Sequence, residues 1–386
     1  GYGKELRELL ASQRIRALVD FCELPVFAAA TDPMIVIVNK GLPPASHEIP
    51  VVVIKDESEF ESLHHSLASR GSLYKPNQLK SEGWSLEGGD GLALVEKLRT
   101  KSKPLGEYLK GKFYYGIKTG LNEAYVIDRS TRDRLIREDR KSSELIRPWI
   151  RGRDIHRWTH EYQDIFVILV RYGFHKELKK YPAILKHLSQ FEDELKARGQ
   201  CQTSRSGDAE GQHHWLELDN NPSQEYLDAF GTPKIVIADI GKYLKATWSE
   251  GGHVIGNTGY IIPNADKALL AILLSSVVDW FARMTFQGLG DPWKGGRMRF
   301  INRNLVKIPI PSALSADKTR LAKLAEKAAR QAESEDAAGL RATEREIDEI
   351  VYRLFDLTAD EIAYIEKSLA GVDRYAANGD EEEEEA

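Results

Sequence analysis

Apolar segments of two different periods alternate irregularly along this chain, and this pattern restricts the fold more than any other feature. Short runs typical of strands are separated by longer segments with helical spacing. The predicted strands are 35–38, 51–54, 124–127, 165–170, 235–238 and 259–262, and the predicted helices are 57–68, 92–109, 178–198 and 267–286. We therefore predict a mixed α/β (α+β) fold without a regular βαβ repeat.

The C-terminal part has a purely helical pattern from Asp317 onward. Leu321, Leu324 and Ala328 share one helical face, and Ile347, Ile350, Val351 and Leu354 share another. Thr358 followed by Glu361 is a capping-box pattern, which predicts the start of a last helix.

Glycine turns and basic side chains gather between residues 115 and 155. YGIKTGLNEAYVID at 115–128 places Lys118, Thr119 and Asn122 near glycines, and RPWIRGRDI at 147–155 contains three closely spaced arginines. Guanidinium, hydroxyl and amide groups bind phosphates and base edges, so this segment favours nucleic-acid contact. GIKTG lacks the spacing of a phosphate-binding P-loop, and a plain strand-to-strand turn is the alternative.

Five strings in one order resemble a known family. They are GIKTGLNEAYVID at 116–128, LIRPWIRGRDIHRW at 145–158, PKIVIADIGKY at 233–243, TGYIIP at 258–263 and RMRFINRNLVKIPIP at 297–311. Together they resemble the TaqI-like C-terminal target-recognition (specificity) domain of adenine-N6 DNA methyltransferases, including type IIG restriction-modification enzymes. The resemblance extends from Pro104 to Pro311 and implies a mixed α/β domain that binds double-stranded DNA.

The beginning of the chain is similar to another part of the same proteins. GYGKELRELLASQRIRALVDFCELPVF followed by TDPMIVIVNK resembles the last helix and strands of their Rossmann-like methyltransferase domain. An amphipathic helix is predicted from Leu6, Leu9, Leu10 and Ile15, and a buried strand from 35–38. The implied organisation is the C-terminal end of a methyltransferase domain at 1–75, a linker at 76–103, a DNA target-recognition domain at 104–313, C-terminal helices at 314–373 and a disordered acidic tail at 374–386.

The predicted DNA-contacting residues carry guanidinium, ammonium, amide or hydroxyl groups. They are Lys118, Thr119, Asn122, Arg151, Arg153, Asn257, Thr258, Lys294, Arg297, Arg299 and Asn302. We expect the arginine loop at 151–153 to bind phosphates and the glycine-rich loop at 290–299 to enter a groove. The alternatives are surface salt bridges for the arginines, turn caps for Asn257 and Thr258, and an ordinary charged loop at 290–299.

The motifs of methyl transfer do not occur in this sequence. The related enzymes hold S-adenosylmethionine on a glycine-rich turn, and they hold the flipped adenine with an Asn/Asp-Pro-Pro-Tyr/Phe/Trp motif. The string at 291–293, Asp-Pro-Trp, lacks the second proline, and Asp-Pro-Met at 32–34 lacks that proline and the aromatic ring. We therefore expect no catalytic, cofactor-binding or metal-binding residues in this chain. Glu194 and Lys196 have a nuclease-like spacing, but they fall within a helical pattern.

The charge distribution agrees with DNA binding despite a formal net charge of −5. Six of the acidic residues lie in the tail at 380–385, whereas residues 104–312 contain 31 Lys/Arg against 25 Asp/Glu. A basic excess in this segment suits phosphate neutralisation. Two cysteines, the absence of a signal pattern and a longest apolar run of 268–278 favour a cytoplasmic protein.

The resemblance implies sequence-specific DNA target recognition for a site-specific adenine-N6 DNA methyltransferase in a restriction-modification or related phage-defence system. The full-length parent would bind S-adenosylmethionine and methylate a flipped adenine, possessing endonuclease activity in the type IIG case, whereas this chain alone would be inactive. The expected partners are double-stranded DNA and an N-terminal methyltransferase domain. The alternative is a structural or protein-interaction module of a multi-subunit restriction-modification complex.

Overall fold

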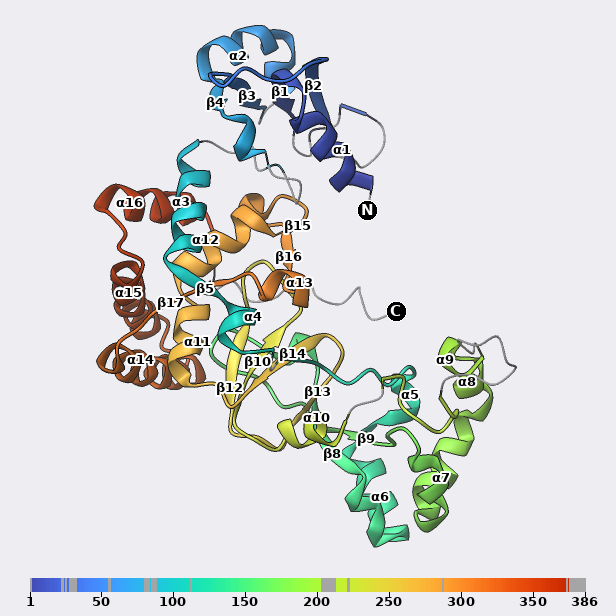
Figure 1. The fold of residues 1–386 in the computed structure, drawn as a ribbon. Coiled ribbons are helices and arrows are strands. Elements are labelled where there is room, and N and C mark those ends of the chain that lie inside the picture. The colour runs from blue at the N-terminus through green and yellow to red at the C-terminus, as the bar shows by residue number, and fades with distance from the viewer. Residues whose placement is uncertain are drawn as a thin grey trace. The chain divides into compact units, whose positions relative to one another are not determined.

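The chain folds into many short helices and several small sheets, which confirms the predicted mixed α/β class (Figure 1). This computed structural model describes residues 2–374 except 22–23, 25, 28–32, 55–56, 80–83, 85–88, 112, 203–212, 221–222, 287 and 373. Residues 375–386, which include most of the predicted acidic tail, lie outside the described residues. The chain divides into two units. Unit 1 comprises Gly1–Lys103, Trp280–Met298 and Leu357–Val372, and unit 2 comprises Pro104–Asp279, Arg299–Asp356 and Asp373–Ala386.

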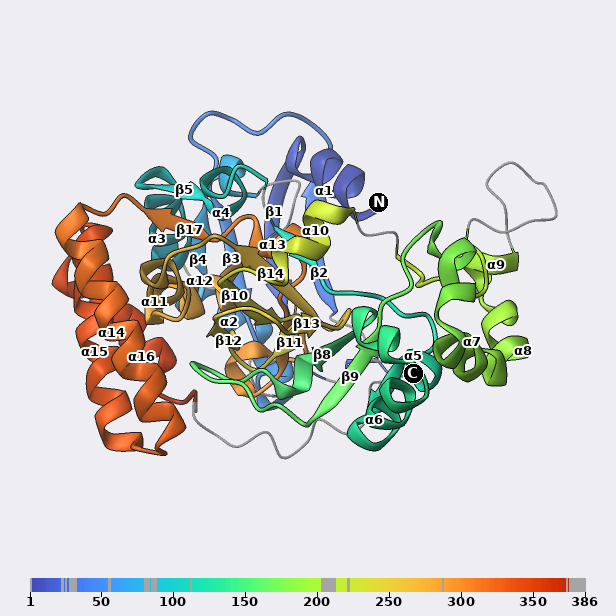
Figure 2. The ribbon, with the colours of Figure 1, turned by 90° about the horizontal axis from the view of Figure 1, so that it is seen from below.

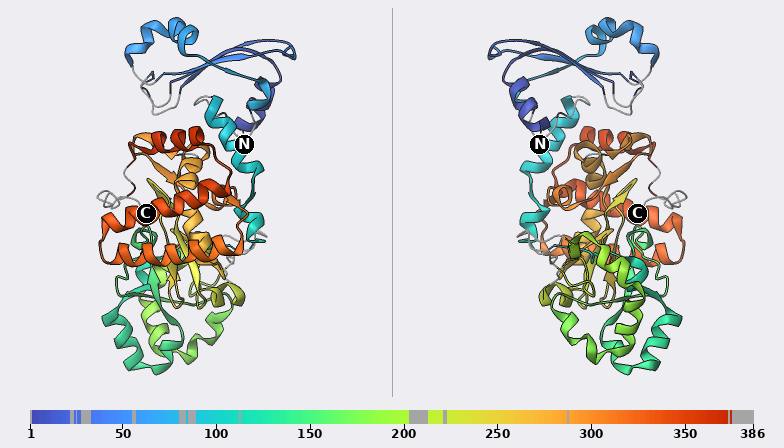
Figure 3. Two further views of the ribbon diagram at one scale, coloured as in Figure 1. Left: turned by 90° about the vertical axis from the view of Figure 1, so that its left-hand side faces the viewer. Right: turned by 90° about the vertical axis from the view of Figure 1, so that its right-hand side faces the viewer.

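Unit 1 contains a four-stranded sheet with the strand order β2-β1-β3-β4, coloured blue in Figure 3. Its strands are β1 (Arg14–Asp20), β2 (Met34–Asn39), β3 (Ile49–Val53) and β4 (Ser72–Tyr74). β1 is parallel to β3, and the other neighbouring strands are antiparallel. The 3-10 turn η1 (Glu57–Ser62) leads into helix α2 (Leu63–Arg70), whose Leu63 and Leu67 pack against Val19 and Val52. These contacts cover one face of the sheet.

The N-terminal helix and β2 differ from the sequence prediction. Helix α1 (Tyr2–Ala11) exposes Leu6 and Leu9, and Ile15 lies in β1 instead of the helix. The large apolar side chains of β2 have exposed fractions between 39% and 48%: Met34, Ile35, Ile37 and Val38. The prediction of a buried strand at 35–38 is therefore wrong for this chain. An apolar run marks a strand that can be buried, but a covering layer is needed to bury it.

Three helical segments complete unit 1: α3 (Gly89–Thr100), the second half of α12 (Ser276–Thr285) and α16 (Ala359–Leu369). Lys97 Nζ donates to Glu361 Oε2 at 2.5 Å, which joins α3 to α16. The hydroxyl of Thr358 accepts from Glu361 N, and the Glu361 carboxylate accepts from Thr358 N. This reciprocal pair confirms the predicted capping box. The strands β15 (Gly288–Leu289) and β16 (Arg297–Arg299) flank the 3-10 turn η7 (Pro292–Lys294).

Two four-stranded sheets lie in unit 2. One is antiparallel with the order β12-β10-β14-β6, and the other has the order β13-β8-β9-β7 with β13 parallel to β8. The strands are β6 (Tyr114–Tyr115), β7 (Val126–Asp128), β8 (Ile146–Ile150), β9 (Ile165–Ile168), β10 (Lys234–Ala238), β12 (Ala246–Ser249), β13 (Val254–Ile255) and β14 (Gly259–Pro263). Every residue of β10 and β14 is buried. The predicted strands at 165–170, 235–238 and 259–262 are confirmed with small changes at their ends.

Two predicted segments of unit 2 are broken into smaller elements. The predicted strand at 124–127 is a helical turn, α5 (Asn122–Tyr125), followed by β7, because a short apolar run suits either a buried turn or a strand. The predicted helix at 178–198 is a series of η5 (Phe174–Lys180), α7 (Pro182–Leu188), η6 (Ser189–Phe191) and α8 (Glu192–Ala197). Pro182 lacks an N–H group and therefore begins a new helix at its first position.

Other short elements connect these parts. They are β5 (Ser102–Pro104), α4 (Leu105–Tyr108), α6 (Arg129–Glu138), η3 (Arg140–Glu144), η4 (Gly152–Asp154), α9 (Gly199–Gln202), α10 (Gln224–Ala229), β11 (Ile240–Gly241), α13 (Asn302–Leu305) and β17 (Pro309–Pro311), with η2 (Pro76–Gln78) in unit 1. The predicted helix at 267–286 is interrupted at 274–275 between α11 (Lys267–Leu273) and α12. No single helix among the described residues is long and apolar enough to cross a membrane, although the bent pair α11 and α12 together meets the length and composition requirement.

The C-terminal helices α14 (Ser315–Glu333) and α15 (Ala337–Leu354) pack side by side, and α14 also packs against α11 (Figure 2). The predicted apolar faces are buried at Leu321, Leu324, Ala328, Ile347, Ile350 and Val351. Arg157 Nε and Trp158 Nε1 both donate to Glu344 Oε1 at 2.6 Å. These two buried hydrogen bonds tie α15 to the end of the segment at 145–158.

Candidate nucleic-acid interface

Four segments of unit 2 meet at the end of β10, around Asp239. Asp239 N donates to Thr258 O at 3.0 Å, and Asp239 O accepts from Phe300 N at 2.7 Å. Gly152 N donates to Thr258 Oγ1 at 2.7 Å, so the arginine loop joins the same place. We define the Asp239 cluster as Tyr115, Arg151, Asp239, Asn257, Thr258, Tyr260, Arg299 and Asn302. It brings together many of the predicted DNA-contacting residues of unit 2.

Two glycines let the backbone segments approach closely enough to form this cluster. A Cβ added to Gly152 would lie 2.2 Å from Thr258 O, and one added to Gly116 would lie 1.8 Å from Gly256 O. Such separations exclude any side chain, so glycine is required at both positions. The glycines of the RGRD and YGIK strings therefore serve the packing of the fold.

Aromatic rings and an amide form one part of the Asp239 cluster. The ring centroid of Tyr115 lies 5.0 Å from that of Tyr260, and Phe113 stacks on Tyr260 at the same distance. The side chain of Asn257 hydrogen-bonds to Tyr115, and Tyr115 is 41% exposed. Burial, followed by the charge of Asp239, raises the pKa of Tyr115 to about 12. The Tyr115 hydroxyl therefore stays protonated at neutral pH and can both donate and accept a hydrogen bond.

A carboxylate and a guanidinium form the charged part of the cluster. Burial raises the pKa of Asp239, while a hydrogen bond from its own backbone N–H and then the positive charges of Arg299 and Lys245 partly oppose that effect. Arg299 is exposed, and neither Arg299 nor Asp239 forms a direct ion pair within the part of the chain that the structure describes. Asn302 is also exposed, and its backbone N–H donates to the Tyr260 hydroxyl at 3.2 Å. The cluster thus presents donors and acceptors beside each other.

One arginine of the loop at 151–153, Arg151, forms an ion pair inside the protein. Arg151 donates from Nε and Nη2 to the two carboxylate oxygens of Asp154, at 2.9 and 2.7 Å. Asp154 is 4% exposed, so this pair anchors the loop from inside the protein. Arg153 is exposed on the 3-10 turn η4. For Arg151 the salt-bridge alternative is found in the structure, and phosphate contact by Arg151 and Arg153 stays a prediction.

A second group consists of Lys118 and Thr119, on the turn after β6, and Asn122, the first residue of α5. Thr119 is 3% exposed, and its hydroxyl donates to Asn122 Oδ1 at 2.7 Å. Lys118 Nζ lies 3.3 Å from Asp219 Oδ2, and the Lys118 side chain is half exposed. The structure therefore gives Thr119 a role in holding the turn, whereas Lys118 and Asn122 present polar groups at the surface. Contact of these side chains with DNA stays a prediction.

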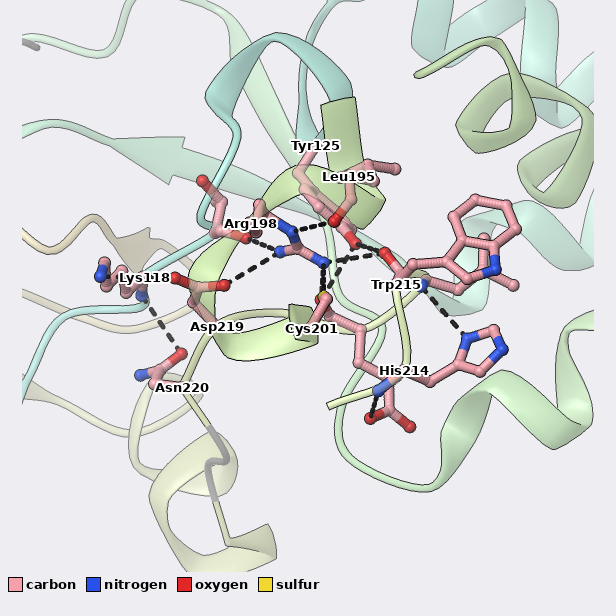
Figure 4. A network of polar contacts seen from close by, with 12 residues as sticks. Lys118, Tyr125, Leu195, Arg198, Cys201, His214, Trp215, Asp219 and Asn220 are labelled. Atoms are coloured by element: carbon pink, nitrogen blue, oxygen red, sulfur yellow. Dashed lines mark hydrogen bonds and ion pairs between the residues drawn. The ribbon is translucent and has the colours of Figure 1, made fainter. Parts of the chain in front are cut away.

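Arg198 organises this second group from below the surface (Figure 4). Its Nη1 donates to Thr119 O at 2.7 Å, and its Nη2 donates to Trp215 O and Glu217 O at 2.8 Å. Asp219 Oδ1 lies 3.2 Å from Arg198 Nη1 and compensates its buried charge. Sequence reasoning missed Arg198, because an arginine after a charged helix resembles any solvated arginine. Asp219, which also contacts Lys118, thus links this buried arginine to a surface cation.

Lys294 and Arg297 lie in the glycine-rich loop of unit 1. Asp291 Oδ1 accepts from Trp293 N at 2.9 Å, and Gly290 and Gly295 have φ values of 85° and 94°. Lys294 is exposed and Arg297 is partly exposed, and within the described residues neither side chain forms an ion pair. These two cations are therefore available to an anionic ligand. Whether they read bases stays a prediction.

The string at 291–293 does not fit the adenine-holding motif. The Asp291 carboxylate caps η7, and the Arg283 guanidinium carbon lies 5.9 Å from the Trp293 ring centroid. Asp291 is therefore engaged within its own loop, and Trp293 is engaged with Arg283 of α12. Lys196 bonds to Glu192 at 2.5 Å, within α8, instead of approaching Glu194. No group of three or more His, Cys, Asp or Glu residues in the described part of the chain could hold a metal ion.

Comparisons with known proteins agree with the sequence resemblance. Residues 147–310 match the family model of the TaqI-like C-terminal specificity domain, and no protein of curated function matches the chain in sequence. The type IIL restriction-modification enzyme MmeI, solved in complex with DNA, is similar with a TM-score of 0.54 and 12% identity, over 93% of this chain and 46% of that chain. The type IIG restriction endonuclease BpuSI has a TM-score of 0.35 and 11% identity, over 90% of this chain and 45% of that chain.

These comparisons define how far the likeness extends. This chain spans about half the length of either solved protein, and the likeness to MmeI is one of fold. The family match begins within β8 and ends within β17. The turn with Lys118 precedes the matched residues, although β6 beside it pairs with β14 in the same sheet.

Proposed function

We propose that the TaqI-like C-terminal specificity domain, which this chain carries at residues 147–310, recognises a DNA target for a restriction-modification system or a related phage-defence system. The match to this family model is the observation on which the proposal rests. The proposal is also supported by the similarity in fold to MmeI, a restriction-modification enzyme solved in complex with DNA. That similarity covers 93% of this chain.

The geometry of the Asp239 cluster also supports this function. The cluster at the end of β10 contains several kinds of hydrogen-bonding group. They are the Asp239 carboxylate, the Arg299 guanidinium, the side-chain amides of Asn257 and Asn302, and hydroxyl groups. Base edges in the major groove offer hydrogen-bond donors and acceptors that such groups can match. The exposed cations Lys294 and Arg299 and the partly exposed Arg297 suit phosphates or guanine.

We further propose that the complete protein is a site-specific adenine-N6 DNA methyltransferase whose S-adenosylmethionine is bound by a domain N-terminal to this chain. The motif resemblance at 1–40 supports this assignment. The exposed apolar side chains of β2 support it independently, since β2 is the terminal strand of its sheet and would be covered by a further layer. When bound, the cofactor would supply the methyl group, and this chain would fix the register of the DNA.

A protein-interaction module is the second candidate, and the same exposed β2 favours it. A surface of this kind suits a separate protein subunit as well as a covalently attached domain. The two candidates differ in whether the 386-residue chain has affinity for DNA. DNA binding therefore separates them.

The test is a fluorescence-anisotropy titration of the 386-residue chain with a labelled duplex at several salt concentrations. We expect binding at low salt that weakens steeply, with log K falling by about 0.9 per phosphate contact for each unit of log salt. Replacing Lys294 and Arg297 together by Ala should weaken binding and reduce that slope by about 1 to 2.

The matched control removes two cations that carboxylates already neutralise. Arg129 is paired with Asp164, and Lys196 is paired with Glu192, so Arg129→Ala with Lys196→Ala should leave the salt slope nearly unchanged. If the folded chain, checked by circular dichroism, binds no duplex at the lowest salt, the DNA-recognition proposal fails and the protein-interaction candidate is favoured.

A further inference from the structure

We propose that Asp239 and Arg299 together read one C·G base pair, with the Asp239 carboxylate accepting from the cytosine amino group and Arg299 donating to the paired guanine. This inference rests on the proposed DNA recognition and adds a specific acceptor that the motif strings did not identify. It follows from the position, the charge and the neighbours of Asp239.

The backbone of Asp239 is held on both sides. Its N–H donates to Thr258 O, and its carbonyl accepts from Phe300 N. Thr258 Oγ1 in turn accepts from Gly152 N, where any side chain would collide with Thr258 O. A side chain on such a fixed backbone can discriminate between bases, because the position of its acceptor atoms does not adapt to a poor ligand.

A carboxylate at this place is unfavourable for binding DNA phosphates. DNA presents a dense negative charge, and most of the affinity of a DNA-binding surface comes from cations. Within the described residues no other side chain donates a hydrogen bond to Asp239, and its raised pKa reflects burial. An acceptor that repels phosphates and receives no hydrogen bond from another described side chain suits a ligand that brings a donor. The exocyclic amino group of cytosine is the base-edge donor that carboxylates accept from.

Arg299 supplies the complementary half of the contact. It is exposed, its charge interacts with that of Asp239, and its side chain makes no direct ion pair among the described residues. Guanine offers the N7 and O6 acceptors that an arginine fork binds with two hydrogen bonds. Because those acceptors and the cytosine amino group lie side by side in the major groove, neighbouring acidic and basic groups can read one base pair.

The surrounding residues make this contact selective. The titratable and charged groups that face Asp239 are Tyr115, Tyr260, Arg299 and Lys245. The two tyrosine rings have centroids 5.0 Å apart, and Asp239 is partly buried. A partly desolvated acceptor loses more when its donor is absent, so a wrong base is penalised.

The test is selection of bound sequences from a pool of randomised duplexes by the 386-residue chain at low salt. Wild-type protein should enrich a fixed C·G pair at one position. Asp239→Ala and, separately, Arg299→Ala should reduce the preference at that position by roughly 10- to 100-fold and leave the other positions unchanged. Asp239→Ala should also keep or raise affinity for unrelated DNA, because one negative charge is removed, whereas damage to the fold would lower it.

Asp228→Ala is the matched control, since Asp228 is an exposed acidic residue on α10. It should leave every base preference unchanged. Enrichment whose pattern neither Asp239→Ala nor Arg299→Ala alters would overturn this inference while leaving DNA recognition intact. Loss of preference at an A·T pair would also overturn it. Absence of any duplex binding by folded wild-type chain would instead remove the proposed function itself.

Discussion

Strands β10 and β2 have similar apolar sequences but different surroundings. β10 reads KIVIA, lies between β12 and β14, and is buried at every residue. β2 reads MIVIVN, is the terminal strand of its sheet, and leaves Ile37 48% exposed. Composition and length of the apolar run are nearly the same. The difference therefore comes from the neighbouring elements that each strand has within this chain.

β10 is covered by neighbouring elements of this chain, whereas β2 leaves apolar side chains exposed. In unit 2, Val236 and Ala238 of β10 pack into a core supplied by the same unit, and Ile235 and Ile237 are fully buried. In unit 1 the outer side chains of β2 remain in contact with solvent, which costs the protein favourable burial. A covering domain or subunit would recover that burial, as the proposed methyltransferase domain would.

The largest expected effect is a difference in stability between matched truncations in the two strands. Ile237 in β10 is fully buried, so Ile237→Ala should lower the free energy of unfolding by about 2 to 5 kcal/mol. Ile37→Ala in β2 should change it by no more than about 0.5 kcal/mol. Urea denaturation of the 386-residue chain, followed by circular dichroism, measures both. A cost for Ile37→Ala as large as that for Ile237→Ala would mean that β2 is covered in solution.

Much of the fold followed from local sequence patterns. The strands at 235–238 and 259–262 and the capping box at Thr358 were predicted because their signals are confined to a few residues. The segment at 124–127 was misassigned, since a run of four apolar-rich residues has no period long enough to separate a turn from a strand. The exposure of β2 depends on elements outside the strand and cannot be derived from its own residues.

The candidate site was predicted in its residue types but not in its arrangement. Asn257, Thr258 and Arg299 were singled out as polar residues beside glycines or strand starts, and the structure brings them to one place. Asp239 was missed because a search for phosphate-binding groups favours cations. Arg198 was missed because its buried partners, Thr119 O and Asp219, lie far away in sequence.

A medium effect is expected from Lys234, which tests whether water reaches the start of β10. Its side chain is fully buried, and Nζ donates to Phe230 O at 2.7 Å. Burial lowers the pKa of Lys234 to about 8. Between about pH 8 and 10.5 the unfolded chain holds a proton that the folded chain has released, so stability rises with pH in that range.

Lys234→Met should remove this dependence. Near pH 7 the variant should be more stable than wild type by about 3 kcal/mol, and the difference should vanish above pH 10.5, where the amine of wild type becomes neutral in both states. Denaturant unfolding at a series of pH values measures the free energy of unfolding of both proteins. Lys307→Met, at an exposed lysine, is the control for the loss of one charge. Equal pH dependence in Lys234→Met and wild type would indicate that water reaches this side chain.

The smallest change in stability is expected from charges placed on β2. Ile35 and Ile37 lie two residues apart, so they point to the same face of the strand, and both are more than 40% exposed. Ile35→Lys with Ile37→Lys should change the free energy of unfolding by no more than about 0.5 kcal/mol, yet lower self-association at high concentration, because charged terminal strands resist pairing. Leu314→Lys, a 76% exposed position outside any strand, is the matched control and should not alter self-association. Light scattering and thermal melting of the three proteins measure both effects, and a large loss of stability in the double variant would contradict the contrast between an uncovered β2 and a buried β10.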